Sequence, residues 1–410
     1  MQHIKTARPF MPPPHNHVRS DFGGAGLNPY YIMVWVLYVL ISSVYIFPKG
    51  MPQPADLLLV AGIGPALMAF FLNYKGSVKP VYLYGILFAA YAFVINWANF
   101  VFFPDKRLAL SSLYYIYNFL TFGFVVYLFK KDSRTVGKLT YYAIVLATFM
   151  QLAWVIFFPD QGVKRMTGGF LNPNQLAYWS LLTAGMLFFL KRYEKINLFD
   201  VILFGTLGYI QTFALSKAGT ISFAILFVYM VFTPHVTRHA KYLIFILIMA
   251  ASMYSVFNPG KVLEVIQGTN TYERVEARLL TIGQENDESL EGRGYNRIWE
   301  NPEYLLFGAG EGAFQRFRTW ASSNELHSGL ATILFSYGVL GSLFFGLFLF
   351  RIFWPQPIVM WMIFGFILMF SVTHQAFRFT HFWAMLGIAY GSYKYGVPLF
   401  KKPKKRLRPG

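Results

Sequence analysis

The sequence predicts an all-α polytopic membrane protein with about twelve transmembrane helices and one large periplasmic loop. Hydrophobic residues make up 56% of the 410 residues and charged residues only 13%, about half the charged share of an average globular chain. Aromatic residues reach 20%, and long apolar runs recur from residue 29 to residue 397. This composition excludes a soluble enzyme and a disordered chain, and the absence of Cys excludes a disulfide scaffold.

The transmembrane helices are predicted from apolar windows that lie between charge clusters and Pro or Gly breaks. A bilayer core needs about 20 apolar residues per helix. Twelve windows meet this need or come near it: 29–47, 57–72, 81–103, 108–129, 139–158, 174–190, 197–214, 218–233, 242–257, 327–350, 356–372 and 379–397.

The charge distribution predicts how the chain is oriented. With a cytoplasmic amino terminus, twelve crossings place 22 of the 36 Lys and Arg residues inside, but only 4 of the 18 Asp and Glu residues. The positive-inside rule favours this arrangement. We therefore expect cytoplasmic tails at 1–28 and 398–410, helices 1–9 over 29–257, a periplasmic loop at 258–326 and helices 10–12 over 327–397. The basic tail suits anionic headgroups, and it lacks the interleaved aromatic residues of a nucleic-acid site.

The loop 258–326 is the long extramembrane segment, with 7 basic and 11 acidic residues. Loops of this length are usually functional, and residues 272–280 have helical charge spacing. No Asp or Glu falls well inside a predicted span, since Asp56 and Asp200 lie at span ends. Intramembrane carboxylates usually carry proton or sodium coupling. Their absence from the spans argues against an ion-driven transporter and leaves a lipid flippase open.

Ionisable side chains on the outer face are the candidates for chemistry. Besides the loop arginines they are Lys164, Arg165, Lys217, His327, His374, Arg378 and His381. Arg165 precedes Asn172 and Pro173, a capping residue followed by Pro at the first helical position. A cation beside a helix N-terminus suits a phosphate. The alternative is that Lys164 and Arg165 extend to lipid headgroups.

Lys217 and His327 are the two candidates with the most specific roles. Lys217 interrupts two apolar runs near membrane depth, where an unpaired ammonium is costly, so we expect it to bind an anion. His327 begins the tenth window, and Gly338, eleven residues later, falls on nearly the same helical face. Histidine is the side chain suited to act as a general base near pH 7. The alternative role for His327 is a structural residue at a helix start.

Two further patterns do not predict sites. Residues 308–312 read Gly-Ala-Gly-Glu-Gly, but no strand–helix unit surrounds this apparent dinucleotide loop. His235 and His239 are spaced i,i+4, but no acidic partner accompanies them as a metal ligand. We predict neither a metal site nor a cofactor.

Four motifs, in order, resemble the bacterial O-antigen polymerase/ligase superfamily of membrane glycosyltransferases. The stretch 165–177 is similar to the family's R-x-x-G-x-F-x-N-P-N-x-L-A motif, and Lys217 follows Ser216 where a Ser-Arg pair is usual. Residues 292–312 resemble the family's Gly-Arg…Trp…Gly-x-Gly-x-Gly segment, and His327 with Gly338 matches H-x₁₀-G. The sequence departs from the family at two places. Lys217 and Ile221 stand where the family has R-x₃-L, and Ser328 follows His327 where Asn is common.

The resemblance implies a metal-independent, inverting enzyme of the bacterial inner membrane, with both termini cytoplasmic and the active site facing the periplasm. Its donor and acceptor would be undecaprenyl-diphosphate-linked glycans. Lys217, Arg165 and Arg293 would hold the diphosphate, and His327 would accept the proton of the attacking hydroxyl. Membrane lipids and a chain-length regulator would be the other partners. The residues with supporting roles would be Arg297, Glu325, Arg378 and Gly338.

The resemblance leaves more than one activity open. A polymerase would build O-antigen, exopolysaccharide or capsule from repeat units, whereas a ligase would transfer the glycan to lipid A-core. The altered R-x₃-L motif favours the polymerase, because lysine keeps the charge but loses bidentate phosphate recognition. A lipid-linked glycan flippase is a third interpretation, which the clustering of cations on the outer face disfavours.

Overall fold

The computed structural model describes residues 27–48, 51–73, 79–158, 165–258, 289–317 and 326–400. This part of the chain is mostly helical, and its β pairing is a single bridge between Ile196 and Val236. The helices are α1 (Pro29–Ile41), α2 (Pro54–Asn73), α3 (Pro80–Phe102), α4 (Lys106–Phe157), α5 (Pro173–Leu190), α6 (Leu198–Ala214), α7 (Lys217–Phe232), α8 (Arg238–Phe257), α11 (Asn296–Glu300), η2 (Pro302–Tyr304), η3 (Phe314–Phe317), α12 (Gly329–Phe353), α13 (Ile358–Thr373) and α14 (Thr380–Tyr395).

Every predicted apolar window coincides with a helix. The windows 108–129 and 139–158 are the two halves of α4, which is interrupted at Asp132 by non-helical backbone (φ −152°, ψ 83°). Among the described residues α3, α4 and α12 are long and apolar enough to cross a membrane, and several shorter helices are apolar too. The structure is therefore that of an all-α membrane protein, while the number of crossings and the domain boundaries stay predictions.

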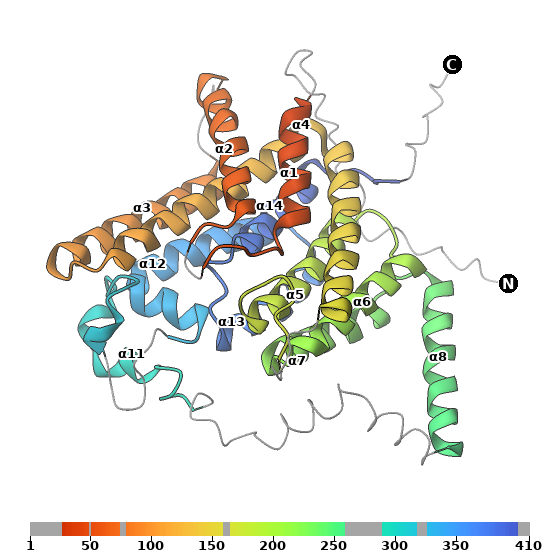
Figure 1. Cartoon of the computed structure of the whole chain (residues 1–410). Helices are drawn as coiled ribbons and strands as arrows, with labels where there is room; N and C mark the ends of the chain where they lie inside the picture. Colours follow the sequence, from red (N-terminus) through yellow and green to blue (C-terminus); the bar gives the residue numbers. More distant parts are fainter. Residues whose placement is uncertain are drawn as a thin grey trace.

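Helices α5 and α14 form the centre of the molecule (Figure 1). In α5 every residue from 176 to 190 is buried, and α14 is buried from 381 to 392. Large apolar side chains lie exposed on the outer helices instead; Phe102 is 77% and Phe232 79% exposed. Apolar surface of this extent on a monomer suits contact with lipid. Helix α8 stands apart at one edge of the view in Figure 1.

The prediction that Gly338 shares a helical face with His327 is wrong. Helix α12 begins at Gly329, two residues after His327, and it is broken at Gly338, where φ is +64° and ψ −172°. A Cβ atom at this position would lie 2.3 Å from the carbonyl oxygen of Leu306. Gly338 therefore makes room for residues of the predicted loop 258–326, which we call the outer loop, and not for a lipid tail.

The loop supplies the backbone hydrogen bonds that the break in α12 removes. In an unbroken helix Val339 would donate to the carbonyl of Phe335. Instead Val339 N donates to Leu305 O at 2.8 Å, and Phe335 O accepts from Ala309 N at 2.9 Å. The next hydrogen bond along the helix is lost as well. Its donor and its acceptor are hydrogen-bonded instead to Leu306 and Gly310 of the loop. Irregular backbone at membrane depth needs such internal partners.

At the other end of the bundle, polar side chains join α4, α5 and α6. Lys191 lies 3.2 Å from Asp200, which also accepts a hydrogen bond from Tyr141 at 2.7 Å. His235 Nε2 lies 2.8 Å from the carbonyl of Lys191. This contact gives His235 a structural role.

Candidate cationic site

Three segments that are distant in sequence meet at the end of α13. Arg293 Nη1 donates to Thr373 O at 2.6 Å, and the backbone N–H of His327 donates to Arg293 O at 3.1 Å. The N–H of Gly329, at the start of α12, donates to His374 O at 2.9 Å. The outer loop, the start of α12 and the end of α13 are thus joined by backbone hydrogen bonds.

His374 lies at the centre of this junction, directly after the last residue of α13. Its ring stacks on Phe370 with centroids 4.7 Å apart, and its Nδ1 is 2.9 Å from Thr373 Oγ1. Burial, together with the positive charges of Arg293, Arg165 and His327, lowers the pKa of His374 to about 3. Charge effects of this kind fade over a Debye length of about 10 Å. Arg165, Arg293 and His327 therefore lie close enough to His374 to affect the charge of its imidazole, and we call these four residues the cationic site.

Arg165 connects the cationic site to the starts of two helices. Its Nη2 donates to Asn174 Oδ1 at 2.6 Å in the first turn of α5, and its Nε donates to Ala214 O at 3.1 Å at the end of α6. Lys217, the first residue of α7, follows Ala214 by three residues, at most about 11 Å of extended chain. Lys217 therefore begins its helix within reach of the Arg165 guanidinium.

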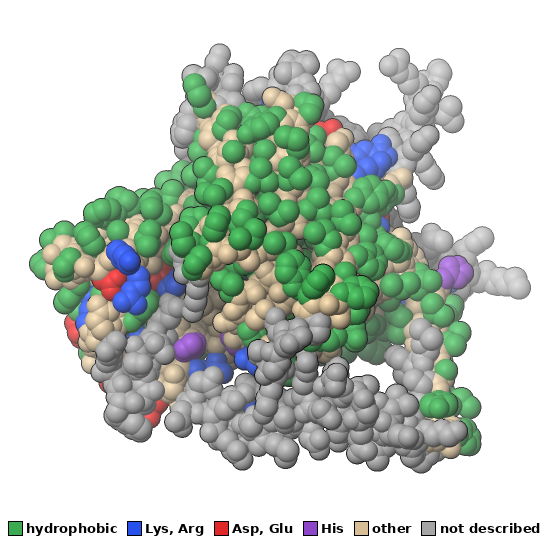
Figure 2. Space-filling model, viewed as in Figure 1, with side chains coloured by type: hydrophobic (Ala, Val, Ile, Leu, Met, Phe, Trp, Pro, Cys, Tyr) green, Lys and Arg blue, Asp and Glu red, His purple; other side chains and the backbone are tan. Residues whose placement is uncertain are grey.

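The helices that begin at this site all have capped N-termini. Asn172 accepts from Asn174 N at 2.8 Å in α5, and Ser328 accepts from Ala331 N at 3.2 Å in α12. In α7 Ser216 accepts from Gly219 N at 3.4 Å. Helix N-termini carry partial positive charge, which adds to that of the Arg and Lys side chains. Figure 2 shows Lys, Arg and His side chains gathered below the large apolar surface.

Arg378 has a structural role rather than a place in the cationic site. Its Nε forms an ion pair with Glu311 Oε1, and the other carboxylate oxygen of Glu311 accepts from Tyr337 OH at 2.7 Å. The N–H of Glu311 donates to Asn96 Oδ1 at 2.7 Å. This buried network fastens the 308–312 segment to α3 and α12, which explains why Glu311 stands among glycines.

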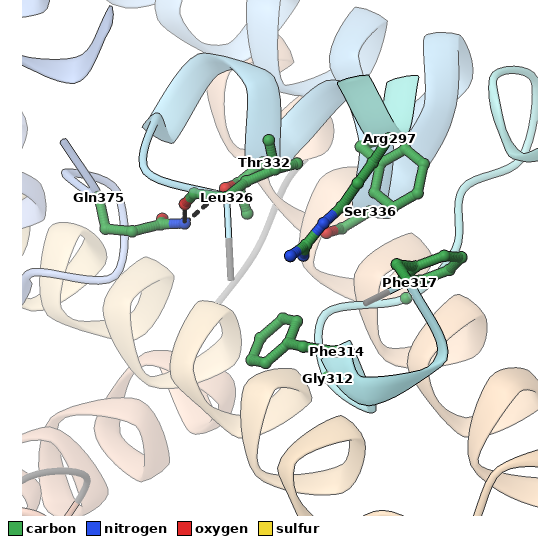
Figure 3. A pocket seen from close by; sticks show the side chains of 10 residues that line it. Arg297, Gly312, Phe314, Phe317, Leu326, Thr332, Ser336 and Gln375 are labelled. Atoms are coloured by element: carbon green, nitrogen blue, oxygen red, sulfur yellow. Dashed lines mark hydrogen bonds between the residues drawn. The ribbon is translucent and has the colours of Figure 1, made fainter. Parts of the chain in front are cut away.

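Arg297 is also separate from the cationic site. It is 1% exposed and lines a small pocket between the outer loop and α12, with Phe314 and Ser336 among its neighbours. Figure 3 shows its guanidinium directed into that pocket, while Gln375 on the far side is hydrogen-bonded to Leu326 and Thr332. The predicted supporting role of Arg297 stays a prediction.

Some predicted residues lie outside the described part of the chain. They are Glu325, Lys164 and the charged stretch 272–280. Conversely, the only role predicted for His374 was that of an ionisable group on the outer face. The available signal was that Thr373, His374 and Gln375 form a polar interruption between two apolar runs, as residues 216–219 do.

Comparison of the chain with protein-family models and with curated proteins finds no match. Among the described residues no group of three or more His, Asp or Glu could hold a metal ion. The functional interpretation therefore depends on the cationic site itself.

Proposed function

We propose that the protein is an inner-membrane glycosyltransferase that polymerises undecaprenyl-diphosphate-linked oligosaccharide repeat units. The observation that carries this proposal is the convergence of Arg165, Arg293 and His327 around His374, beside the first turns of α5 and α7. A cluster of guanidinium groups and helix N-termini suits a diphosphate. The family resemblance of the motifs that contribute these residues supports the same activity.

In the proposed reaction an acceptor hydroxyl attacks the anomeric carbon of the donor sugar. The new C–O bond forms as the bond to the diphosphate oxygen breaks, and the configuration inverts. The hydroxyl proton passes to His327. Arg165, Arg293 and Lys217 stabilise the negative charge that develops on the leaving diphosphate.

The choice of His327 over His374 as the base follows from their environments. His327 is exposed to solvent, and its backbone N–H donates to Arg293 O. His374, with a pKa of about 3, is too weak a base near neutral pH, where an effective general base has a pKa close to the working pH. We assign His374 the role of a neutral neighbour that holds the α13 end in place.

The ligase and the flippase each predict a feature that a polymerase does not need. Lys217 and Ile221 depart from the R-x₃-L motif, and this favours the polymerase over the ligase. A flippase that moves an anionic lipid needs available cations toward both faces. The candidate diphosphate ligands Arg165, Arg293 and Lys217 all lie on the predicted outer face, which favours an enzyme.

The deciding experiment supplies the purified protein with a lipid-linked repeat unit, with and without lipid A-core. A ladder of lengthened lipid-linked glycans without lipid A-core supports the polymerase. Product that forms only on lipid A-core indicates the ligase, and loss of donor from one leaflet of a vesicle without product indicates the flippase. A thiol placed at Ser289 should react from outside the cell, because the proposal requires a periplasmic site.

A further inference from the structure

A second pocket lies at the ends of α1, α2 and α14 and is lined by none of the residues of the cationic site. Its buried floor consists of Tyr38, Ser42 and His381. Half-buried residues at its mouth include Asp56 and Thr380. The remaining lining residues are Tyr45, Gln53, Ala55 and Phe379. The first turns of α2 and α14 both contribute to this pocket.

Asp56 carries a negative charge that no cation in the described part of the chain neutralises through a salt bridge. Its Oδ2 accepts from Gln53 N at 2.9 Å, and its Oδ1 accepts from Tyr117 OH at 3.2 Å and Thr380 Oγ1 at 3.4 Å. These partners are neutral and two of the contacts are long. A carboxylate has about four lone-pair positions, so Asp56 retains capacity for a further donor.

One ring nitrogen of His381 in the same pocket has no hydrogen-bond partner among the described residues. His381 is 3% exposed, and its Nε2 lies 3.2 Å from Thr183 Oγ1 in α5. Its Nδ1 is buried without a hydrogen-bond partner among the described residues. Buried polar atoms in native proteins are normally satisfied by protein, water or ligand. With the proton of His381 on Nδ1, a hydroxyl could accept from Nδ1–H and donate its own proton to the Asp56 carboxylate.

The size of the pocket limits what that group can be. The cavity is about 20 Å³, enough for one oxygen-sized group and too small for a sugar ring. The aromatic side chains of Tyr45 and Phe379 flank it, and aromatic faces pack well against the apolar faces of sugars. Phe379 and Phe170 have ring centroids 6.2 Å apart. Phe170 belongs to the segment that carries Arg165, so the pocket adjoins the cationic site.

We propose that this pocket is a carbohydrate subsite, in which one sugar hydroxyl enters between Asp56 and His381 while the ring rests on Tyr45 and Phe379. The hydroxyl donates to the Asp56 carboxylate and accepts a hydrogen bond from His381 Nδ1–H. The assignment of the bound sugar to the glycan substrate rests on the proposed function, whereas carbohydrate binding itself does not. The pocket then recognises part of the glycan beside the reacting group.

The test measures binding of methyl glycosides to the full-length protein in phosphatidylcholine nanodiscs by saturation-transfer NMR, with no lipid-linked donor present. The probes are methyl glycosides of a hexose, an N-acetylhexosamine and a 6-deoxyhexose. We compare Asp56→Asn, which removes the charge, with Ala55→Val, which fills the pocket from the first turn of α2. Ala61→Val is the matched control, because Ala61 lies exposed farther along α2.

We expect wild type and Ala61→Val to bind at least one glycoside with equal affinity. Asp56→Asn and Ala55→Val should each weaken that affinity tenfold or more, with unchanged thermal unfolding. If wild type binds no glycoside, or if both pocket variants bind as wild type does, the pocket holds only water and the inference is wrong. Failure of the proposed function would instead appear as wild-type protein that binds glycosides but makes no product from the donor.

Discussion

The Arg293 guanidinium lies 2.6 Å from the carbonyl oxygen of Thr373, the last residue of α13. The C-terminal carbonyls of a helix lack intrahelical partners, and Arg293 supplies one from the outer loop, 80 residues away. The Arg293 carbonyl in turn accepts the N–H of His327. One residue thus fixes the loop against α13 and sets the position of the proposed base.

Replacing Arg293 should therefore affect both activity and loop order. We expect Arg293→Ala to abolish glycan product at normal expression and to speed proteolysis of the loop near residue 293. Arg293→Lys should restore part of the loop protection but little activity, because lysine lacks the planar fork. Arg107→Ala is the control, since Arg107 is an exposed arginine paired with Asp105. A fully active Arg293→Ala variant would contradict the proposed diphosphate site.

Lys217 should be replaceable by arginine but not by alanine. We expect Lys217→Ala to abolish donor turnover, because it removes the positive charge at the first position of α7. Lys217→Arg should retain activity, since it restores the residue usual in the resembled family. Turnover is measured with purified protein and lipid-linked donor, and Lys241→Ala in α8 serves as the control. Chelators should leave turnover unchanged. Equal activity of the alanine and arginine variants would remove Lys217 from the site.

His327 should be essential through its ring and not through its backbone. The observed hydrogen bond to Arg293 uses the His327 N–H, which His327→Gln and His327→Asn both keep. We therefore expect both variants to fold and bind donor, yet to lose on the order of 10²-fold in rate, the typical contribution of a general base. Single-turnover kinetics at saturating donor measure the loss. A near-normal rate for the glutamine variant would leave Glu325 as the next candidate base.

Gly338 should tolerate no side chain, unlike a second glycine of the same helix. Gly338→Ala places a Cβ in a positive-φ conformation and against Leu306 O, so strain alone should destabilise the protein by about 1–3 kcal/mol. At Gly346 a Cβ meets nothing within 4 Å. Gly346→Ala should be neutral or stabilising by up to about 1 kcal/mol. Thermal unfolding in detergent compares the two, and equal stabilities would mean that the break in α12 is not needed.

Protonation of His374 should destabilise the folded protein as the pH falls. Its folded pKa of about 3 lies below the unfolded value of about 6.5. Between these values the unfolded state binds more protons, so stability rises with pH across that window. We expect His374→Gln to lose less stability than wild type between pH 6.5 and pH 4. Unfolding temperatures against pH test this, with His239→Gln, at an exposed position, as the control. Parallel curves would exclude His374 as the sensitive group.

The positions of the helices could be predicted from the order of the residues alone, because a helix long and apolar enough for a membrane is specified by its own residues. The windows 81–103 and 174–190 became α3 and α5 almost unchanged. The N-terminal cap of α5 could be predicted for the same reason, because it depends on neighbouring residues. Asn172 and Pro173 mark the start of α5 from adjacent positions in the chain.

Which cations share a site depends on how the helices and the loop pack together. Arg165, Arg293 and His327 meet at His374 because the outer loop pairs with the ends of α12 and α13. Arg378 does not join them, since Glu311 neutralises it. The break at Gly338 could not be predicted from the sequence either, because helical periodicity assumes an unbroken backbone. Its replacement hydrogen bonds come from residues 305–310, and no local pattern specifies such distant partners.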